Sequence, residues 1–150
     1  MNELSSLERK TWGNFIVAWA TINRIVEDDL QANGQITHVE YEITLRLYRA
    51  EGRKMRIQEL GKQSLLTRSG TSRAVARLEQ LGLVRRETAP EDRRGSYAVL
   101  TDAGQELFEK LMPPHLLCVR EHFLRHFSTD ELTQLAEFLG RLTDKNCKPR

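Results

Sequence analysis

The sequence contains few cysteines and no long hydrophobic segment. Only Cys118 and Cys147 are present among its 150 residues, too few for a disulfide framework. No apolar run reaches the roughly 18 residues that span a membrane, and the first ten residues, MNELSSLERK, lack the apolar core of a secretion signal. These absences predict a soluble, cytoplasmic protein with reduced thiols.

Motifs for catalysis are lacking as well. The sequence has no glycine-rich phosphate loop, no metal-hydrolase motif and no nucleophile elbow, and its four histidines have no paired nucleophile. We therefore predict a protein that is not an enzyme and needs no cofactor. The composition, 39% hydrophobic and 29% charged, is typical of a packed domain rather than of a disordered chain.

Basic residues are concentrated in the middle of the chain, although the net charge is only +2. Residues 53–94 hold 11 basic and 5 acidic side chains, a local charge of +6, whereas the remaining residues hold 12 basic and 16 acidic ones, a charge of −4. A basic centre of this kind indicates a surface for nucleic acid. A solvated charged face would give the same pattern, so the motifs must decide between them.

Apolar residues at steps of three and four predict helices over about 7–30, 38–49, 57–64, 68–81, 102–123 and from 129 onward. Thr37 with Glu40, and Ser128 with Glu131, have the spacing of capping boxes. The pair Pro113-Pro114 predicts a kink or a break in the fifth helix, because proline removes a backbone donor.

The periodicity changes after Gly82, where residues 83–87 and 97–100 alternate as short strands around a loop at 89–96. The third and fourth helices, joined by a short connector that ends at Thr67, form a helix-turn-helix. A hairpin directly after a helix-turn-helix is a wing. The predicted fold is therefore mainly α, a winged helix-turn-helix with a two-stranded β-wing.

The fourth helix and the wing carry the predicted DNA contacts. An α-helix fits the major groove, where arginine bonds to guanine, and a narrow minor groove attracts arginine from a wing. Asp92 is expected to pair with a neighbouring arginine and hold the hairpin tip in one shape. The predicted contacts are Arg68, Ser69, Thr71, Ser72, Arg73, Arg77, Arg86, Asp92, Arg93 and Arg94.

Residues 65–107, LLTRSGTSRAVARLEQLGLVRRETAPEDRRGSYAVLTDAGQEL, resemble the winged-helix core of the MarR family of bacterial transcription regulators. RLEQLGLVRR carries the likeness together with Asp92-x-Arg94 and Leu100-Thr101 followed by Gly104. The resemblance implies an obligate homodimer built from the first, fifth and sixth helices, with Arg94 in the minor groove and residues 68–77 reading the major groove. Where the family often has Ser or Thr before its third helix, this chain has Arg56.

The domain division expected from this resemblance is a DNA-binding lobe at residues 37–101, with dimerisation helices at 1–36 and 102–150. We predict a sequence-specific regulator, a repressor that binds double-stranded DNA as a homodimer on a pseudo-palindromic operator. Two alternatives stay open: a winged-helix protein-interaction module without specific DNA binding, and a metal- or redox-sensing regulator of the same fold.

Ligand sites have weaker signals. Members of the family commonly respond to small aromatic or phenolic ligands bound between the dimerisation helices and the lobe, and the candidate pocket residues here are Trp12, Trp19, Tyr41 and Tyr48. Aromatic residues at helical spacing are more often part of a core. Cys118, His122 and His126 share one helix face at the spacing of metal ligands, but they are weak candidates, and no metal site is predicted.

Overall fold

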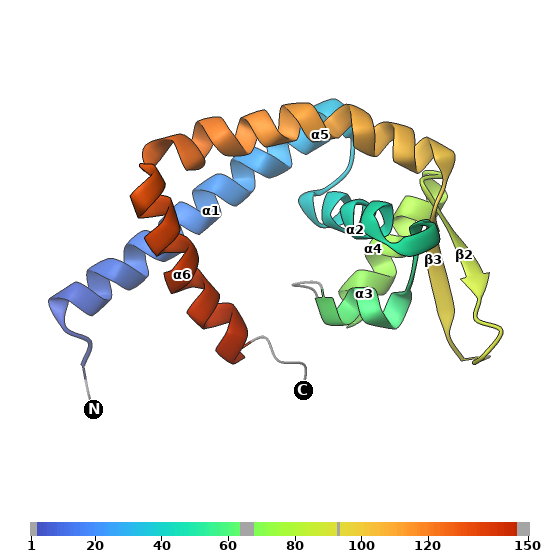
Figure 1. Cartoon of the computed structure of the whole chain (residues 1–150), viewed down its shortest axis with the longest axis horizontal. Coiled ribbons are helices and arrows are strands. Elements are labelled where there is room, and N and C mark those ends of the chain that lie inside the picture. Colours follow the sequence, from blue (N-terminus) through green and yellow to red (C-terminus); the bar gives the residue numbers. More distant parts are fainter. Residues whose placement is uncertain (1–2, 64–67, 93, 147–150) are drawn as a thin grey trace.

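The computed structural model describes residues 3–63, 68–92 and 94–146, which form six α-helices and a three-stranded sheet (Figure 1). The elements follow one another as α1 (Ser6–Gly34), α2 (His38–Arg49), η1 (Glu51–Arg53), β1 (Lys54–Arg56), α3 (Ile57–Gln63), α4 (Arg68–Gln80), β2 (Val84–Thr88), β3 (Ser96–Leu100), α5 (Asp102–His122), η2 (Leu124–His126) and α6 (Thr129–Asn146). This order contains the predicted helices and hairpin.

The antiparallel sheet has the strand order β1-β3-β2, so the wing has one strand more than the two predicted. β1 is only three residues long and pairs Arg56 with Tyr97 of β3. Its sequence, Lys-Met-Arg, contains a single apolar residue and is too short to show an alternating pattern, which explains why the sequence did not reveal it. The third strand ties the wing to the segment that leads into α3.

A core shared by α2, α3, α4 and the sheet holds the lobe together. Leu47, Leu60, Val75 and Leu78 are fully buried, and Leu100 of β3 joins them. These residues come from the apolar positions of the predicted helices and strands. Their burial fixes α4 and the β2–β3 hairpin relative to each other.

Both predicted capping boxes are confirmed. The backbone N–H of Glu40 donates to Thr37 Oγ1 at 3.1 Å, and the Thr37 N–H donates to Glu40 Oε2 at 2.8 Å. Ser128 and Glu131 bond reciprocally in the same way at the start of α6. The connector residue Thr67 lies outside the described residues.

α5 runs unbroken through Pro113 and Pro114, as one bowed helix in Figure 1, so of the two expected outcomes, a kink or a break, the break is wrong. Phe108, Leu111 and His115 are buried on both sides of the proline pair, and this packing holds the helix in place. The side chains one turn earlier, at residues 109 and 110, are exposed. Water can therefore bond to the carbonyls that the prolines leave without a donor.

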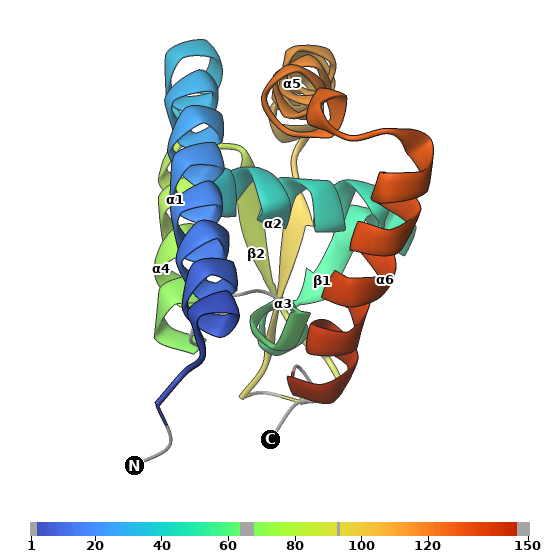
Figure 2. The same ribbon diagram turned by 90° about the vertical axis from the view of Figure 1, so that its left-hand side faces the viewer.

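The N-terminal half of α1 and the whole of α6 lie apart from the lobe, at the far end of α5 (Figures 1 and 2). Every residue from Glu3 to Thr21 is exposed, and the described part of α6 contains no buried residue. Large apolar side chains on these helices are exposed to solvent: Leu7 is 73% exposed, Trp12 60% and Phe138 50%. Within the described residues, no helix is long and apolar enough to cross a membrane.

Candidate DNA-binding surface

The exposed face of α4 carries several of the predicted contacts. Ser69 and Arg73 are exposed and Ser72 is half-buried, whereas Val75 and Leu78 anchor the opposite face in the core. The Arg73 Nε–H donates to the Ser69 carbonyl at 3.4 Å, which directs this guanidinium back along the helix. The side chain of Arg68 lies outside the described ones.

Two predicted contacts on α4 differ from the others: the side chain of Thr71 is buried, whereas that of Arg77 is 46% exposed and bonded within the subunit. Thr71 is only 1% exposed, because it lies on the same side of the helix as the core residues. The Arg77 guanidinium donates to Glu40 Oε2 at 2.9 Å and to the Gln35 carbonyl at 3.2 Å. The burial of Thr71 corrects the predicted contact there, and the contacts of Arg77 give that residue a structural role between α4 and α2.

The wing presents the remaining arginines. Arg86 Nε lies 3.3 Å from Glu79 Oε2, and its Nη2 donates to the Ser72 carbonyl at 3.4 Å. The backbone N–H of Arg94 donates to Asp92 Oδ1 at 3.0 Å, while no carboxylate among the described residues pairs with the Arg94 side chain. The predicted contact Arg93 lies outside the described residues.

A polar cavity of about 370 Å³ lies between the wing and the helix-turn-helix. Ser72 of α4, Arg86 of β2 and Arg94 of the wing all contribute to it, so residues from three elements meet at one surface. Its lining also includes Arg56, Ile57, Gln58, Asp92, Gly95 and Ser96. Exposed ion pairs contribute little to stability, so a phosphate oxygen can replace Glu79 as the partner of Arg86.

Asp92 does pair with an arginine, but with one that the sequence interpretation did not select. Its Oδ2 lies 3.9 Å from Nη2 of Arg56 on β1, and Glu91 Oε1 lies 3.4 Å from the same nitrogen. The pairing depends on the short strand β1, which the sequence pattern missed. The residue directly before a helix is usually interpreted as its N-cap. For this reason the side chain of Arg56, which precedes α3, was not assigned to the wing.

The four aromatic candidates for an effector site lie in two separate places, which corrects the predicted pocket. Trp12 and Trp19 are 60% and 58% exposed on the outer part of α1. Tyr41 is buried between Phe108 and His115, with ring centroids 5.4 and 4.3 Å away. The fourth, Tyr48, also packs on the Phe108 ring, and its hydroxyl donates to Glu109 at 3.2 Å.

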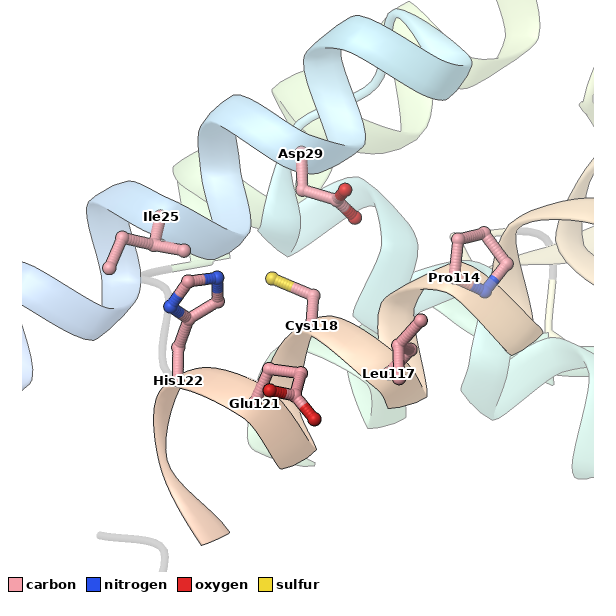
Figure 3. Close-up of a pocket in the computed structure, with 7 residues that line it drawn as sticks. All are labelled: Ile25, Asp29, Pro114, Leu117, Cys118, Glu121 and His122. Atoms are coloured by element: carbon pink, nitrogen blue, oxygen red, sulfur yellow. The ribbon is translucent and has the colours of Figure 1, made fainter. Parts of the chain in front are cut away.

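A different pocket, of about 330 Å³, lies between α1 and α5 (Figure 3). Ile25 and Leu117 supply apolar surface, and the Cys118 thiol and the His122 ring point into the space between the helices. Its remaining lining residues are Asp29, Pro114 and Glu121. The sequence pattern did not reveal this site, because its residues come from two helices that are about 90 positions apart in the chain.

The weak metal candidates do not form a metal site in the part of the chain that the structure describes. Cys118 and His122 line the α1–α5 pocket, while His126 lies beyond the end of α5 in η2. The described residues contain no group of three or more histidine, cysteine or acidic side chains placed to hold a metal ion. Burial raises the pKa of the Cys118 thiol, and Asp29 adds to this, which disfavours the reactive thiolate.

A helix-turn-helix packed on a three-stranded sheet, with Ser72 of α4 and the wing residues Arg86 and Arg94 at one cavity, defines a winged-helix DNA-binding protein. The MarR family matches residues 35–95 of the chain. A MarR family transcriptional regulator from Streptomyces coelicolor, solved in complex with DNA, is 33% identical and superposes with a TM-score of 0.94 over 99% of this chain and 92% of that one. The chain therefore belongs to the MarR family of transcriptional regulators.

Two further relatives agree with this assignment. AbsC, another MarR family regulator from Streptomyces coelicolor, is 33% identical, with a TM-score of 0.90 over 96% of this chain and 97% of AbsC. The uncharacterized HTH-type transcriptional regulator YkoM of Bacillus subtilis is 35% identical over 86 residues, which span 57% of this chain and 55% of YkoM. These relatives are regulators rather than enzymes, as the sequence predicted.

Proposed function

We propose that this protein is a homodimeric repressor that binds a pseudo-palindromic DNA operator and releases it when a small molecule binds. The observation that carries the proposal is the shared cavity of Ser72, Arg86 and Arg94. It places a polar helix face and a wing arginine side by side, as a protein needs in order to contact adjacent major and minor grooves. Ser69, Arg73 and Asp92 complete the proposed surface, with Arg68 and Arg93 kept as sequence-based predictions.

Homodimerisation is supported by the exposed apolar surfaces of α1, α5 and α6. Trp12 and Val17 on α1, Leu116 on α5, and Phe138 and Leu142 on α6 are each at least half exposed. Exposed apolar surface of this extent is typical of an interface rather than of a monomer. We propose that residues 1–36 and 102–150 form the dimer and that residues 37–101 form the DNA-binding lobe.

The dimer explains the proposed palindrome. Two identical lobes related by a twofold axis contact successive major grooves about 34–36 Å apart, so the operator repeats its sequence in inverted form. Where such an operator overlaps a promoter, a regulator bound to it without a ligand obstructs transcription, in the cytoplasm where bacterial DNA lies. We therefore propose repression rather than activation.

The α1–α5 pocket is the proposed effector site. It combines the apolar side chains of Ile25, Pro114 and Leu117 with a thiol, an imidazole and two carboxylates, a lining that suits a small aromatic or phenolic molecule. Because α1 and α5 connect the proposed dimer base with the lobe, a ligand between them would alter the distance between the two lobes. It lowers DNA affinity only if it binds one spacing better than the other.

Selection of bound duplexes from a random DNA library, at a stated salt concentration, tests the proposal. We expect an inverted repeat whose half-sites are about one helical turn apart. Affinity for this duplex should fall steeply with added salt, because arginines displace counterions from phosphates. Recovery of no sequence motif would favour a winged-helix protein-interaction module instead.

A further inference from the structure

We propose that Arg56 positions the wing for DNA binding by fastening the hairpin tip to the strand that leads into α3. The inference rests on the proposed DNA-binding function and concerns a residue outside the predicted contacts. Arg56 is the last residue of β1 and pairs with Tyr97 of β3. Its backbone is therefore fixed in the sheet, while its side chain reaches the tip of the wing.

The Arg56 guanidinium is held by two carboxylates and an aromatic ring. Its Nη2 lies 3.4 Å from Glu91 Oε1 and 3.9 Å from Asp92 Oδ2, and its Cζ lies 5.3 Å from the centre of the Tyr97 ring. The Tyr97 hydroxyl donates to the same Glu91 oxygen at 2.6 Å. These four side chains connect β1, β3 and the loop between β2 and β3.

The contact with Asp92 links Arg56 to Arg94. While Oδ2 of Asp92 faces Arg56, its Oδ1 accepts the backbone N–H of Arg94 at 3.0 Å, and its carbonyl accepts the N–H of Gly95 at 3.0 Å. The carboxylate thus shapes the backbone that carries the Arg94 side chain. Arg56 holds the carboxylate, so it acts on DNA binding through Arg94.

Gly95 makes room for this arrangement. A Cβ at position 95 would overlap Nη1 of Arg56 and would lie 3.3 Å from Asp92 Oδ2. Alanine here would displace the flexible end of the arginine rather than the backbone. The substitution Gly95→Ala therefore removes the contact but keeps the positive charge, which separates positioning of the wing from direct attraction to phosphate.

The contact is expected to affect binding more than folding. Exposed ion pairs contribute little to the stability of a folded protein, so the variants should retain the parent's melting temperature. A loop tip that is ordered before it meets DNA loses less conformational freedom on binding. Loss of the Arg56 contact should therefore appear as weaker DNA binding by an otherwise intact protein.

The test measures dissociation constants for the duplex that the parent protein selects. We expect Arg56→Ala and Gly95→Ala each to weaken binding by about two- to tenfold, as the tip must then be ordered during binding. In an Arg94→Ala background, Arg56→Ala should cause almost no further loss of DNA affinity. Arg56 acts through the Arg94 side chain, so its effect disappears once that side chain is removed. Lys54→Ala is the matched control: Lys54 also lies over the Tyr97 ring, at 5.1 Å, but within the described residues it lies beyond ion-pair distance of the carboxylates at the tip.

Additive losses in the double variant, together with an unchanged affinity of Gly95→Ala, would overturn the proposal in favour of a direct phosphate contact. Hydrogen exchange in the DNA-free protein supplies a second readout. Exchange of the Arg94 and Gly95 amides should be faster in Arg56→Ala than in the parent, and equal rates would also contradict the proposal. If the parent selects no duplex, the proposed function fails, whereas the exchange measurement still tests the role of Arg56.

Discussion

The guanidinium of Arg77 on α4 donates to the buried carboxylate of Glu40 on α2 at 2.9 Å. Glu40 is 3% exposed and also accepts the backbone N–H of Thr37. One carboxylate therefore caps α2 and holds α4. The orientation of α4, and with it the proposed DNA-reading face, depends on a residue that precedes the first residue of α4 by 28 positions.

We expect Arg77→Ala to lower the free energy of unfolding by about 1–3 kcal/mol, because it leaves a buried carboxylate without its charged partner. Denaturant titration followed by circular dichroism measures this change. Arg73→Ala, on the exposed face of the same helix, is the matched control and should stay within about 0.5 kcal/mol of the parent. Equal stability of the two variants would show that the Arg77–Glu40 contact does not hold the lobe together.

Arg94→Ala tests the wing. The side chain has no carboxylate partner among the described residues and lines the cavity beside Ser72 and Arg86. Its loss should weaken binding to the selected duplex by about 1–3 kcal/mol and leave the melting temperature unchanged. Fluorescence anisotropy with a labelled duplex measures the affinity.

Arg85→Ala serves as the control for this measurement. Arg85 lies next to Arg86 in β2, so it points to the opposite face of the sheet, and it pairs with Glu87. Its removal takes away the same charge from the same hairpin. A loss of affinity as large as that of Arg94→Ala would indicate a general effect of charge rather than a specific wing contact.

The helices and the hairpin were largely predictable, because their signals are local. Apolar spacing and the Thr37–Glu40 and Ser128–Glu131 capping boxes lie within a few residues of the ends that they define. α1 ends later than the predicted residue 30, at Gly34, and its C-cap residue Gln35 has the left-handed conformation (φ 55°). The continuity of α5 depends on packing against α1 and α2, which no local pattern contains.

The candidate site was only partly predictable, for the same reason. Residue type and position placed Arg94 and Asp92 at the wing, but the partner of Asp92, Arg56, comes from a strand that has no sequence signature. The choice of Thr71 followed its polar character, whereas its position on α4 buries it. Both the partner of Asp92 and the burial of Thr71 depend on contacts between segments that are distant in the sequence. The periodicity of apolar residues gives no information about such contacts.

Phe138→Glu tests the proposed dimer. Phe138 is 50% exposed on α6, and a carboxylate there would be desolvated at an apolar interface. Sedimentation should give about twice the subunit mass of 17.4 kDa for the parent and the subunit mass for the variant. Thr133→Glu, on the other side of the same helix, should remain dimeric. A monomeric parent at micromolar concentration would contradict the proposal.

His115 predicts a pH dependence of stability. Its side chain is buried against Tyr41, and its Nδ1 has no hydrogen-bond partner among the residues that the structure describes. Burial lowers the pKa of His115 below its ordinary value of 6.5. His38 adds to this, and Glu42 and Asp29 oppose it. The unfolded chain therefore binds a proton at a higher pH than the folded chain does.

Stability should accordingly fall as the pH drops below about 6.5. Protonation of His115 lowers the free energy of unfolding by at most about 1.4 kcal/mol for each pH unit. This loss continues down to the pKa of His115 in the folded protein. Unfolding free energies of the parent and of His115→Leu, measured from pH 8 to pH 5, give the two slopes. The variant should lose less stability on acidification. The same slope for both proteins would show that His115 is not the group responsible.

The α1–α5 pocket predicts how an effector acts. Cys118→Phe places a large ring in the space that Ile25, Leu117 and His122 enclose. We expect this variant to bind the selected duplex like the parent but to respond poorly to simple phenols and aromatic carboxylates. In the parent, an active compound should weaken DNA binding by a factor that saturates, corresponding to a coupling energy of about 1–3 kcal/mol. A loss of affinity that grows without limit as the ligand concentration rises would instead indicate competition for the DNA-binding surface.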